Sequence, residues 1–135
     1  MVTETLGDRK IEASERLARE LVDRGSPMLA AYWEFREDDG RWTLMLVPKS
    51  PKEERQLIRE ATALLVEDPY RSIFSISDSA IDSLQIERAR ALGAYIRVEP
   101  YVGRRIDKTF TGRQYFESVV PVYFSPELMT HLHVA

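Results

Sequence analysis

The segment Met28–Val47 (MLAAYWEFREDDGRWTLMLV) restricts the fold more than any other part of the chain. It contains both tryptophans, and its apolar residues alternate on either side of the turn signal Asp39-Gly40. Strand side chains point alternately to opposite faces of a sheet. The pattern therefore predicts a β-hairpin, in which one face carries the following apolar set: Leu29, Ala31, Trp33, Phe35, Trp42, Leu44 and Leu46.

Two geometries are open for the turn of this hairpin. Asp39-Gly40 suits a two-residue turn with positive φ at both central positions, and a four-residue loop over Glu37–Gly40 is the alternative. The two registers differ by two residues, so both place Trp33 on the face that carries Trp42. The aromatic face is the same in either case.

Two amphipathic helices flank the hairpin. The first is expected over residues 8–24, with Asp8 as N-cap (Thr5 is the weaker alternative) and Gly25 in the left-handed position after its end. The second begins at Ser50-Pro51-Lys52-Glu53, which has the spacing of a capping box with proline at the first helical position. It is expected to continue to about Glu67, before Asp68-Pro69 stops it.

The next segment alternates polar and apolar residues over Arg71–Ile76, which predicts a short strand. Ser77-Asp78-Ser79 then offers caps for a third helix over about Ala80–Leu92, ending at Gly93. The stretch Tyr95–Val98 has the composition of a strand, although Pro100 and Gly103 follow it closely.

A second hairpin is predicted near the end of the chain. Its arms are Ile106–Phe110 and Gln114–Phe124, and its turn is Thr111-Gly112-Arg113. Pro121 cannot donate a hydrogen bond to a neighbouring strand, so the second arm is expected at a sheet edge or with a bulge. Ser125-Pro126-Glu127 can begin a short terminal turn of helix.

These elements predict one α+β domain over residues 1–135, with residues 1–7 as a tail and 126–135 as an end that frays. The predicted order is α-β-β-α-β-α-β-β. Hairpins pair their strands antiparallel, so we expect one mainly antiparallel sheet with about three helices packed on it.

The composition excludes several classes of protein. The chain has no cysteine, so it has neither a disulfide framework nor thiolate-ligated zinc. No apolar run approaches the length of a membrane span, and the first ten residues lack a signal-peptide core. A cytoplasmic location and no contact with membranes are the resulting expectations. The net charge of −3 argues against broad binding of nucleic acid.

The hairpin and its surroundings resemble a group of small bacterial proteins with no known activity. The resemblance is carried by AAYWEF, by DGRWTLMLVPKSP with the capped helix after it, and by Gly112-Arg113-Gln114-Tyr115-Phe116-Glu117 in the late strand. It covers most of the chain, and its matched positions are chiefly core residues. It therefore implies a fold and a bacterial origin, and it assigns no catalytic residue.

Two groups of residues are candidates for binding. Trp33, Phe35 and Trp42 share one sheet face, with Tyr32 opposite, and such aromatic residues anchor protein interfaces as well as cores; core packing is the favoured interpretation. The second group combines basic residues with neighbouring aromatic ones, as sites for single-stranded nucleic acid or phosphate ligands do. It consists of Arg104, Arg105, Lys108 and Arg113. Its alternative is a solvated hairpin whose charges protect a sheet edge.

Other patterns carry less information. His131 and His133 could ligate a metal from one face of a strand, but they stand close to the end of the chain without a third ligand. The cluster of Glu34, Glu37, Asp38 and Asp39 could hold a cation, yet hairpin turns use such residues for backbone reasons. No phosphate-binding loop or nucleophile motif is present, so we predict no catalytic residue, no metal and no cofactor.

The sequence favours a non-enzymatic accessory or regulatory protein that acts through protein contacts, including a homodimer. Binding of nucleic acid or a phosphate ligand by the basic hairpin is the alternative. A carboxylate- or metal-dependent enzyme comes third.

Overall fold

A five-stranded sheet forms the centre of the computed structural model, which describes residues 6–98 and 105–130. Its strand order is β3-β2-β1-β5-β4, and every neighbouring pair is antiparallel except β2 and β3. The strands are β1 (Met28–Arg36), β2 (Arg41–Pro48), β3 (Ser79–Ile81), β4 (Ile106–Thr111) and β5 (Gln114–Phe124). The predicted α+β class and the mainly antiparallel sheet are confirmed.

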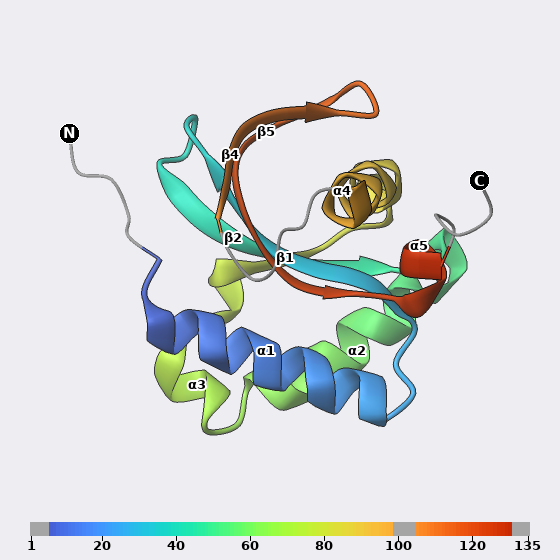
Figure 1. Ribbon diagram of the computed structural model, residues 1–135. Helices are drawn as coiled ribbons and strands as arrows, with labels where there is room; N and C mark the ends of the chain where they lie inside the picture. Colours follow the sequence, from blue (N-terminus) through green and yellow to red (C-terminus); the bar gives the residue numbers. More distant parts are fainter. Residues whose placement is uncertain (1–5, 99–104, 131–135) are drawn as a thin grey trace.

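Helices cover both faces of this sheet, as Figure 1 shows, with α1, α2 and α3 beneath it and α4 above it. The helices are α1 (Asp8–Asp23), α2 (Glu54–Leu65), α3 (Tyr70–Ile73), α4 (Ile86–Val98) and α5 (Pro126–Thr130). Single turns of 3-10 helix at Pro51–Glu53 and Ser83–Gln85 lead into α2 and α4. The described chain thus has five helices where the sequence predicted about three.

The first hairpin has the longer of the two turns. Its predicted faces are correct except at Leu29, which packs in the cluster on the opposite face because the register shifts between Met28 and Ala30. Arg36 pairs with Arg41, so residues 37–40 form a four-residue loop, and Gly40 has a φ of +63°. Phe35 lies opposite Trp42, and Trp33 lies opposite Leu44. The aromatic face is therefore confirmed.

The lower face of the sheet packs on α1, α2 and α3 in one apolar cluster. Trp33 is fully buried there, and its indole Nε1 donates a hydrogen bond of 2.9 Å to the Ser14 hydroxyl on α1. Ser14 in turn donates to the Ile11 carbonyl at 2.7 Å. Leu6, inside the predicted tail, also packs against this cluster.

The upper face packs on α4 and α5 in a second cluster, which includes Tyr32, Phe116 and Leu92. Gly93 lies inside α4 rather than at its end, and a Cβ there would be 3.4 Å from Phe124 and 3.5 Å from Leu128. The predicted helix end at Gly93 and the strand-like reading of Tyr95–Val98 are therefore wrong. Tyr95 packs against the second cluster, which stabilises the last turns of α4.

The strand predicted over Arg71–Ile76 is also wrong. Residues 70–73 form α3, and Tyr70 and Phe74, four positions apart, place stacked rings 6.3 Å apart in the lower cluster. The strand in this part of the chain is instead β3, which pairs parallel to β2. Tertiary packing of two aromatic rings at helical spacing has overridden the local alternation.

The long strand β5 lies between β1 and β4, and is not an edge. Its register with β1 shifts where Ala31 pairs with Tyr123 and Tyr32 pairs with Pro121. The irregularity accommodates the proline, which has no N–H for the ladder, so the bulge alternative is confirmed.

Near its turn, the β4–β5 hairpin contacts α4. Gly112 has a φ of +56°, and a Cβ on it would come 2.8 Å from the Ala91 Cβ. The Thr111 hydroxyl donates a hydrogen bond of 3.0 Å to the Ala91 carbonyl. The absence of a side chain at Gly112 allows this close approach.

We predict that Gly112→Ala lowers the free energy of unfolding by about 2–4 kcal/mol. Part of this loss comes from the left-handed backbone at residue 112, and part comes from the clash of the new Cβ with Ala91. Gly40→Ala is the matched control, because it has the same positive φ but open space around its Cβ. It should cost only about 1–2 kcal/mol. Urea unfolding measures both, and equal losses would contradict the contact with α4.

Candidate functional site

A buried ion pair lies on the upper face of the sheet. Glu34, in the last part of β1, is only 4% exposed, and its Oε2 accepts a hydrogen bond from and forms an ion pair with Nη2 of Arg88 on α4. The Arg88 Nη1 also donates to the Tyr115 carbonyl at 3.0 Å, and its guanidinium lies 4.1 Å from the centre of the Phe116 ring. One arginine therefore joins α4 to both β1 and β5.

The burial of this pair changes the titration of its neighbours. Loss of solvent raises the pKa of Glu34, and the charges of Arg88 and Arg36 oppose that rise. Burial, and then the charge of Glu34, raise the pKa of Tyr32. A buried carboxyl with a raised pKa beside a cation is the kind of group that binding and catalytic sites use.

Several polar atoms around the pair have no well-formed hydrogen bond within the described residues. They are Glu34 Oε1, Gln85 Oε1, Arg88 Nε and the hydroxyl of Tyr32, which lies near Arg88. The Arg36 Nη2 lies 3.9 Å from Glu34 Oε1. Buried polar atoms are hydrogen-bonded in most proteins, so this concentration of exceptions needs a cause.

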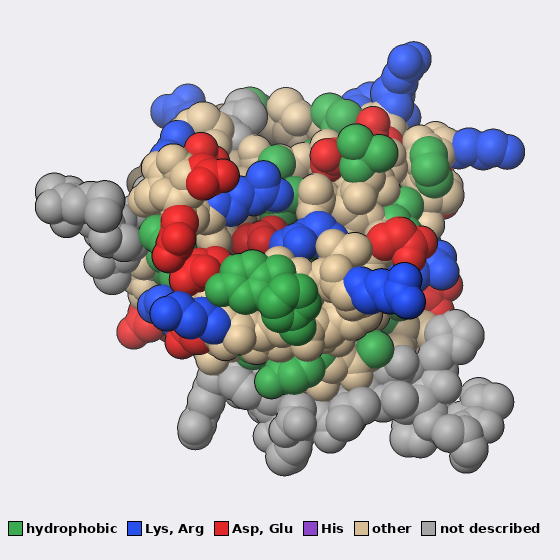
Figure 2. All heavy atoms as spheres, turned by 90° about the horizontal axis from the view of Figure 1, so that it is seen from above, with side chains coloured by type: hydrophobic (Ala, Val, Ile, Leu, Met, Phe, Trp, Pro, Cys, Tyr) green, Lys and Arg blue, Asp and Glu red, His purple; other side chains and the backbone are tan. Residues whose placement is uncertain are grey.

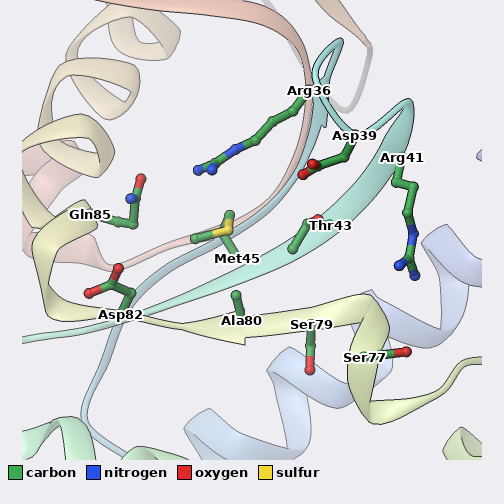
Figure 3. A pocket seen from close by; sticks show the side chains of 10 residues that line it. All are labelled: Arg36, Asp39, Arg41, Thr43, Met45, Ser77, Ser79, Ala80, Asp82 and Gln85. Carbon is green, nitrogen blue, oxygen red and sulfur yellow. The ribbon is translucent and has the colours of Figure 1, made fainter.

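A cavity of about 560 Å³ lies between the first hairpin, β3 and the turn before α4, and Gln85 is one of the residues that line it. Thr43 and Met45, which are the register partners of Glu34 and Tyr32, form part of its floor. Figure 3 shows Arg36 reaching across it toward Gln85, with Asp39 projecting inward beside Thr43. The remaining residues that line it are Arg41, Ser77, Ser79, Ala80 and Asp82.

At one end of the cavity the charges are already paired. Arg41 Nη2 lies 3.2 Å from Asp78 Oδ1, and Lys10 Nζ lies 3.6 Å from Asp78 Oδ2. In Figure 3 the Arg41 side chain points away from Gln85. Arg36 and Gln85 are therefore the polar groups that face each other across the interior.

The β4–β5 hairpin exposes two aromatic rings. Phe110 is 73% exposed and Tyr115 is 41% exposed, and their ring centres are 5.1 Å apart. We call these two residues the aromatic pair. Figure 2, which looks down on the molecule from above, shows hydrophobic side chains surrounded by charged ones of both signs on this side.

The basic residues predicted on this hairpin are in different surroundings. Arg105 pairs with Asp107 at 2.7 Å and lies 5.3 Å from the Trp42 ring centre, while Lys108 and Arg113 are exposed with φ values of 45° and 67°. A hydrogen bond from Ser118, together with Arg105, lowers the pKa of Asp107. Arg104 lies outside the described residues.

The predicted aromatic interface residues lie mostly in the core. Trp33 and Tyr32 are fully buried, Trp42 is 3% exposed, and Phe35 is partly buried against the lower cluster. Of the acidic cluster, Glu34 is buried and Asp39 faces the cavity, so the two do not act as one surface group. His131 and His133 lie outside the described residues.

Sequence reasoning identified neither Arg88 nor Gln85. A signal existed for Glu34, because it is the one charged residue in the otherwise apolar run Met28–Phe35. Its cation comes from a helix 54 positions later, and no local spacing connects the two. The partner depends on how α4 lies on the sheet.

Comparisons with known proteins return no relatives: no family model, curated protein or solved structure matches the chain. Within residues 6–98 and 105–130, no three His, Cys, Asp or Glu side chains are grouped so that they could hold a metal ion. In the same part of the chain, no helix has the length and apolar character needed to cross a bilayer.

We predict that Arg88→Ala lowers the free energy of unfolding by about 3–5 kcal/mol at neutral pH, because it leaves a buried carboxylate without its cation. The loss should be smaller at about pH 5. Without Arg88 the pKa of Glu34 rises further, so the folded variant binds a proton more tightly than the unfolded chain does, and acidification relieves the penalty.

Urea unfolding at the two pH values measures this effect. Arg24→Ala is the control, since Arg24 makes an exposed pair with Glu20 at 3.8 Å, and its loss should cost about 0.5 kcal/mol or less. A loss for Arg88→Ala that does not depend on pH would show that Glu34 is not the group concerned.

Proposed function

We propose that this protein is a non-enzymatic accessory or regulatory protein that acts through protein contacts. We further propose that it forms a homodimer. The observation that carries the proposal is the aromatic pair. Large aromatic rings that lie exposed and adjacent mark interaction sites more often than single exposed apolar residues do. Tyrosine and phenylalanine are also enriched at the buried centres of interfaces.

The charges around the aromatic pair favour a second copy. Lys108 and Arg113 are exposed on the hairpin, and Glu117 accepts a hydrogen bond of 2.7 Å from the Tyr115 hydroxyl. That hydrogen bond, together with the charges of Glu117 and Glu37, raises the pKa of Tyr115. In a twofold contact the same patch meets itself, so a patch with both signs can pair each sign with its opposite.

The backbone of β4 indicates how the contact forms. β4 is an edge strand, but Lys108 interrupts it with a φ of 45°, and the exposed charges of Arg105 and Asp107 precede it. Irregular backbone and charge protect sheet edges from pairing with another strand. The contact is therefore expected through side chains of the aromatic pair and not through an extended sheet.

The phosphate-binding alternative has less support from the described residues. Of its four basic residues, Arg105 is already paired with Asp107, and acidic Glu37 and Glu117 lie near the same aromatic rings. A polyanion would meet these carboxylates unfavourably. That alternative and the carboxylate-dependent enzyme remain predictions from sequence.

We predict that the protein forms a dimer with a dissociation constant in the range of about 1–100 µM, and that Phe110→Ser with Tyr115→Ser weakens it by at least about tenfold. Sedimentation velocity over a concentration series measures the change. Ile58→Ser is the matched control: Ile58 is 41% exposed, as Tyr115 is, but it lies on α2 beneath the sheet.

A chain that stays monomeric up to about 100 µM would overturn the proposal. So would a control variant that weakens the dimer as much as the loss of the aromatic pair does. A dimer that dissociates in moderate salt and survives the aromatic changes would indicate a contact carried by charge instead.

A further inference from the structure

The cavity between the first hairpin, β3 and the turn before α4 is lined almost entirely by polar groups. Its volume of about 560 Å³ lies within the range of about 300–1,000 Å³ that is typical of small-molecule sites. Eight of the ten side chains that line it are polar or charged. The other two are Ala80, which is half-buried, and Met45, which is only 3% exposed. A ligand in this cavity is therefore held by hydrogen bonds more than by apolar contact.

Two carboxylates of the lining are placed to accept hydrogen bonds from a ligand. Asp39 is exposed at the turn of the first hairpin, projects into the cavity (Figure 3) and has no hydrogen bond or ion pair within the described residues. Asp82 is half-buried and accepts a hydrogen bond of 2.9 Å from the Leu84 N–H at Oδ1, which leaves its Oδ2 for a ligand. An ionised carboxylate only accepts hydrogen bonds, so these residues require a ligand with donors.

Arg36 supplies donors to the same cavity. Its side chain is 45% exposed, and Figure 3 shows it extending toward Gln85. Its one described ion pair, with Glu34, is long at 3.9 Å, so N–H groups of the guanidinium remain available. A guanidinium donates hydrogen bonds and accepts none. The ligand must therefore carry acceptors as well as donors.

The charges around the cavity do not favour an ion of either sign. The two arginines of the lining, Arg36 and Arg41, are matched in number by its two aspartates. Arg41 is also paired with Asp78 at 3.2 Å. A strongly anionic ligand would be repelled by the aspartates, and a strongly cationic one would be repelled by Arg36. An uncharged ligand that both donates and accepts hydrogen bonds avoids these two costs.

Neighbouring hydroxyl groups meet these requirements. Each hydroxyl donates one hydrogen bond and accepts others. Two adjacent hydroxyls can donate to the two oxygens of one carboxylate, and two others can accept from the fork of a guanidinium. Hydrogen bonds in which one partner is ionised are roughly twice as strong as those between neutral groups. The Thr43 hydroxyl adds a neutral partner at the same cavity.

We propose that this cavity binds a neutral saccharide. Hydroxyl groups of the sugar would donate to Asp39 and Asp82 and accept from Arg36, and the apolar face of the ring would lie toward Ala80. The site shares no residue with the aromatic pair, so the inference goes beyond the self-association proposed above and does not depend on it.

Saturation-transfer NMR and titration of the full chain test the proposal, with D-glucose, D-galactose, D-mannose, L-fucose, D-xylose and D-ribose as the probes. At least one of these sugars should bind with a dissociation constant below about 10 mM. At least one of its monodeoxy analogues should bind about fivefold more weakly or worse, because it lacks a hydroxyl that pairs with a charged side chain. The corresponding amino sugar or uronic acid should bind no more tightly than the neutral parent.

Variants at the turn of the first hairpin connect the binding to the named residues. Asp39→Asn and Arg36→Gln should each weaken the binding of the sugar at least about fivefold. Both side chains are exposed, so both variants should keep the wild-type melting temperature. Asp38→Asn is the matched control and should bind as the wild type does, because Asp38 is the exposed neighbour in the same turn and does not line the cavity.

The proposal fails on any of four results: no sugar of the series binding below about 10 mM, a charged derivative binding about tenfold tighter than the neutral parent, full affinity in Arg36→Gln, or equal losses in Asp38→Asn and Asp39→Asn. The Phe110→Ser, Tyr115→Ser variant should keep the wild-type affinity for the sugar. Binding that vanishes with the aromatic pair would place the sugar at the interface between copies and reject the cavity.

Discussion

The arrangement of the whole molecule depends on one constraint: β1 is the central strand and is buried on both faces. Seven consecutive residues, Met28–Glu34, are buried, and the seventh is a carboxylate. Removing an ionised carboxylate from water is costly unless a cation and hydrogen bonds replace the solvent. Arg88 provides them, and because the same guanidinium contacts Tyr115 and Phe116, satisfying Glu34 also connects α4 to β5.

This constraint explains why the two faces of the sheet differ. The lower face has Trp33 and Trp42 in an apolar cluster with three helices, and the buried indole N–H of Trp33 is satisfied by Ser14. The upper face is covered chiefly by α4, which begins after Gln85, so a cavity remains that Thr43 and Met45 line. Polar side chains such as Thr43 and Gln85 therefore border an open cavity. The two surfaces suited to recognition, the cavity and the aromatic pair, both result from this partial cover.

Sequence reasoning succeeded where the signal was local. Gly25, with a φ of +81°, has the left-handed conformation expected after the first helix. The segment Ser50–Glu53 leads into α2 as expected, but the predicted capping box is wrong. The Ser50 hydroxyl donates to the Glu53 carboxylate at 2.9 Å, and neither side chain caps the backbone. Prediction from the sequence failed at Arg71–Ile76 and at Gly93, because each pattern is compatible with two structures. A segment that alternates like a strand can also place aromatic rings four residues apart, on one side of a helix. A glycine can permit close packing against a helix instead of ending it.

The sequence by itself determined the α+β class and the register-independent aromatic face of the first hairpin. These follow from side-chain periodicity and turn chemistry, which act over a few residues. Only the tertiary structure decided that β5 lies beside β1, that β3 pairs parallel to β2, and that Arg88 reaches Glu34 across 54 positions. Such choices depend on long-range burial and on the pairing of buried charge. No short window of sequence contains both partners.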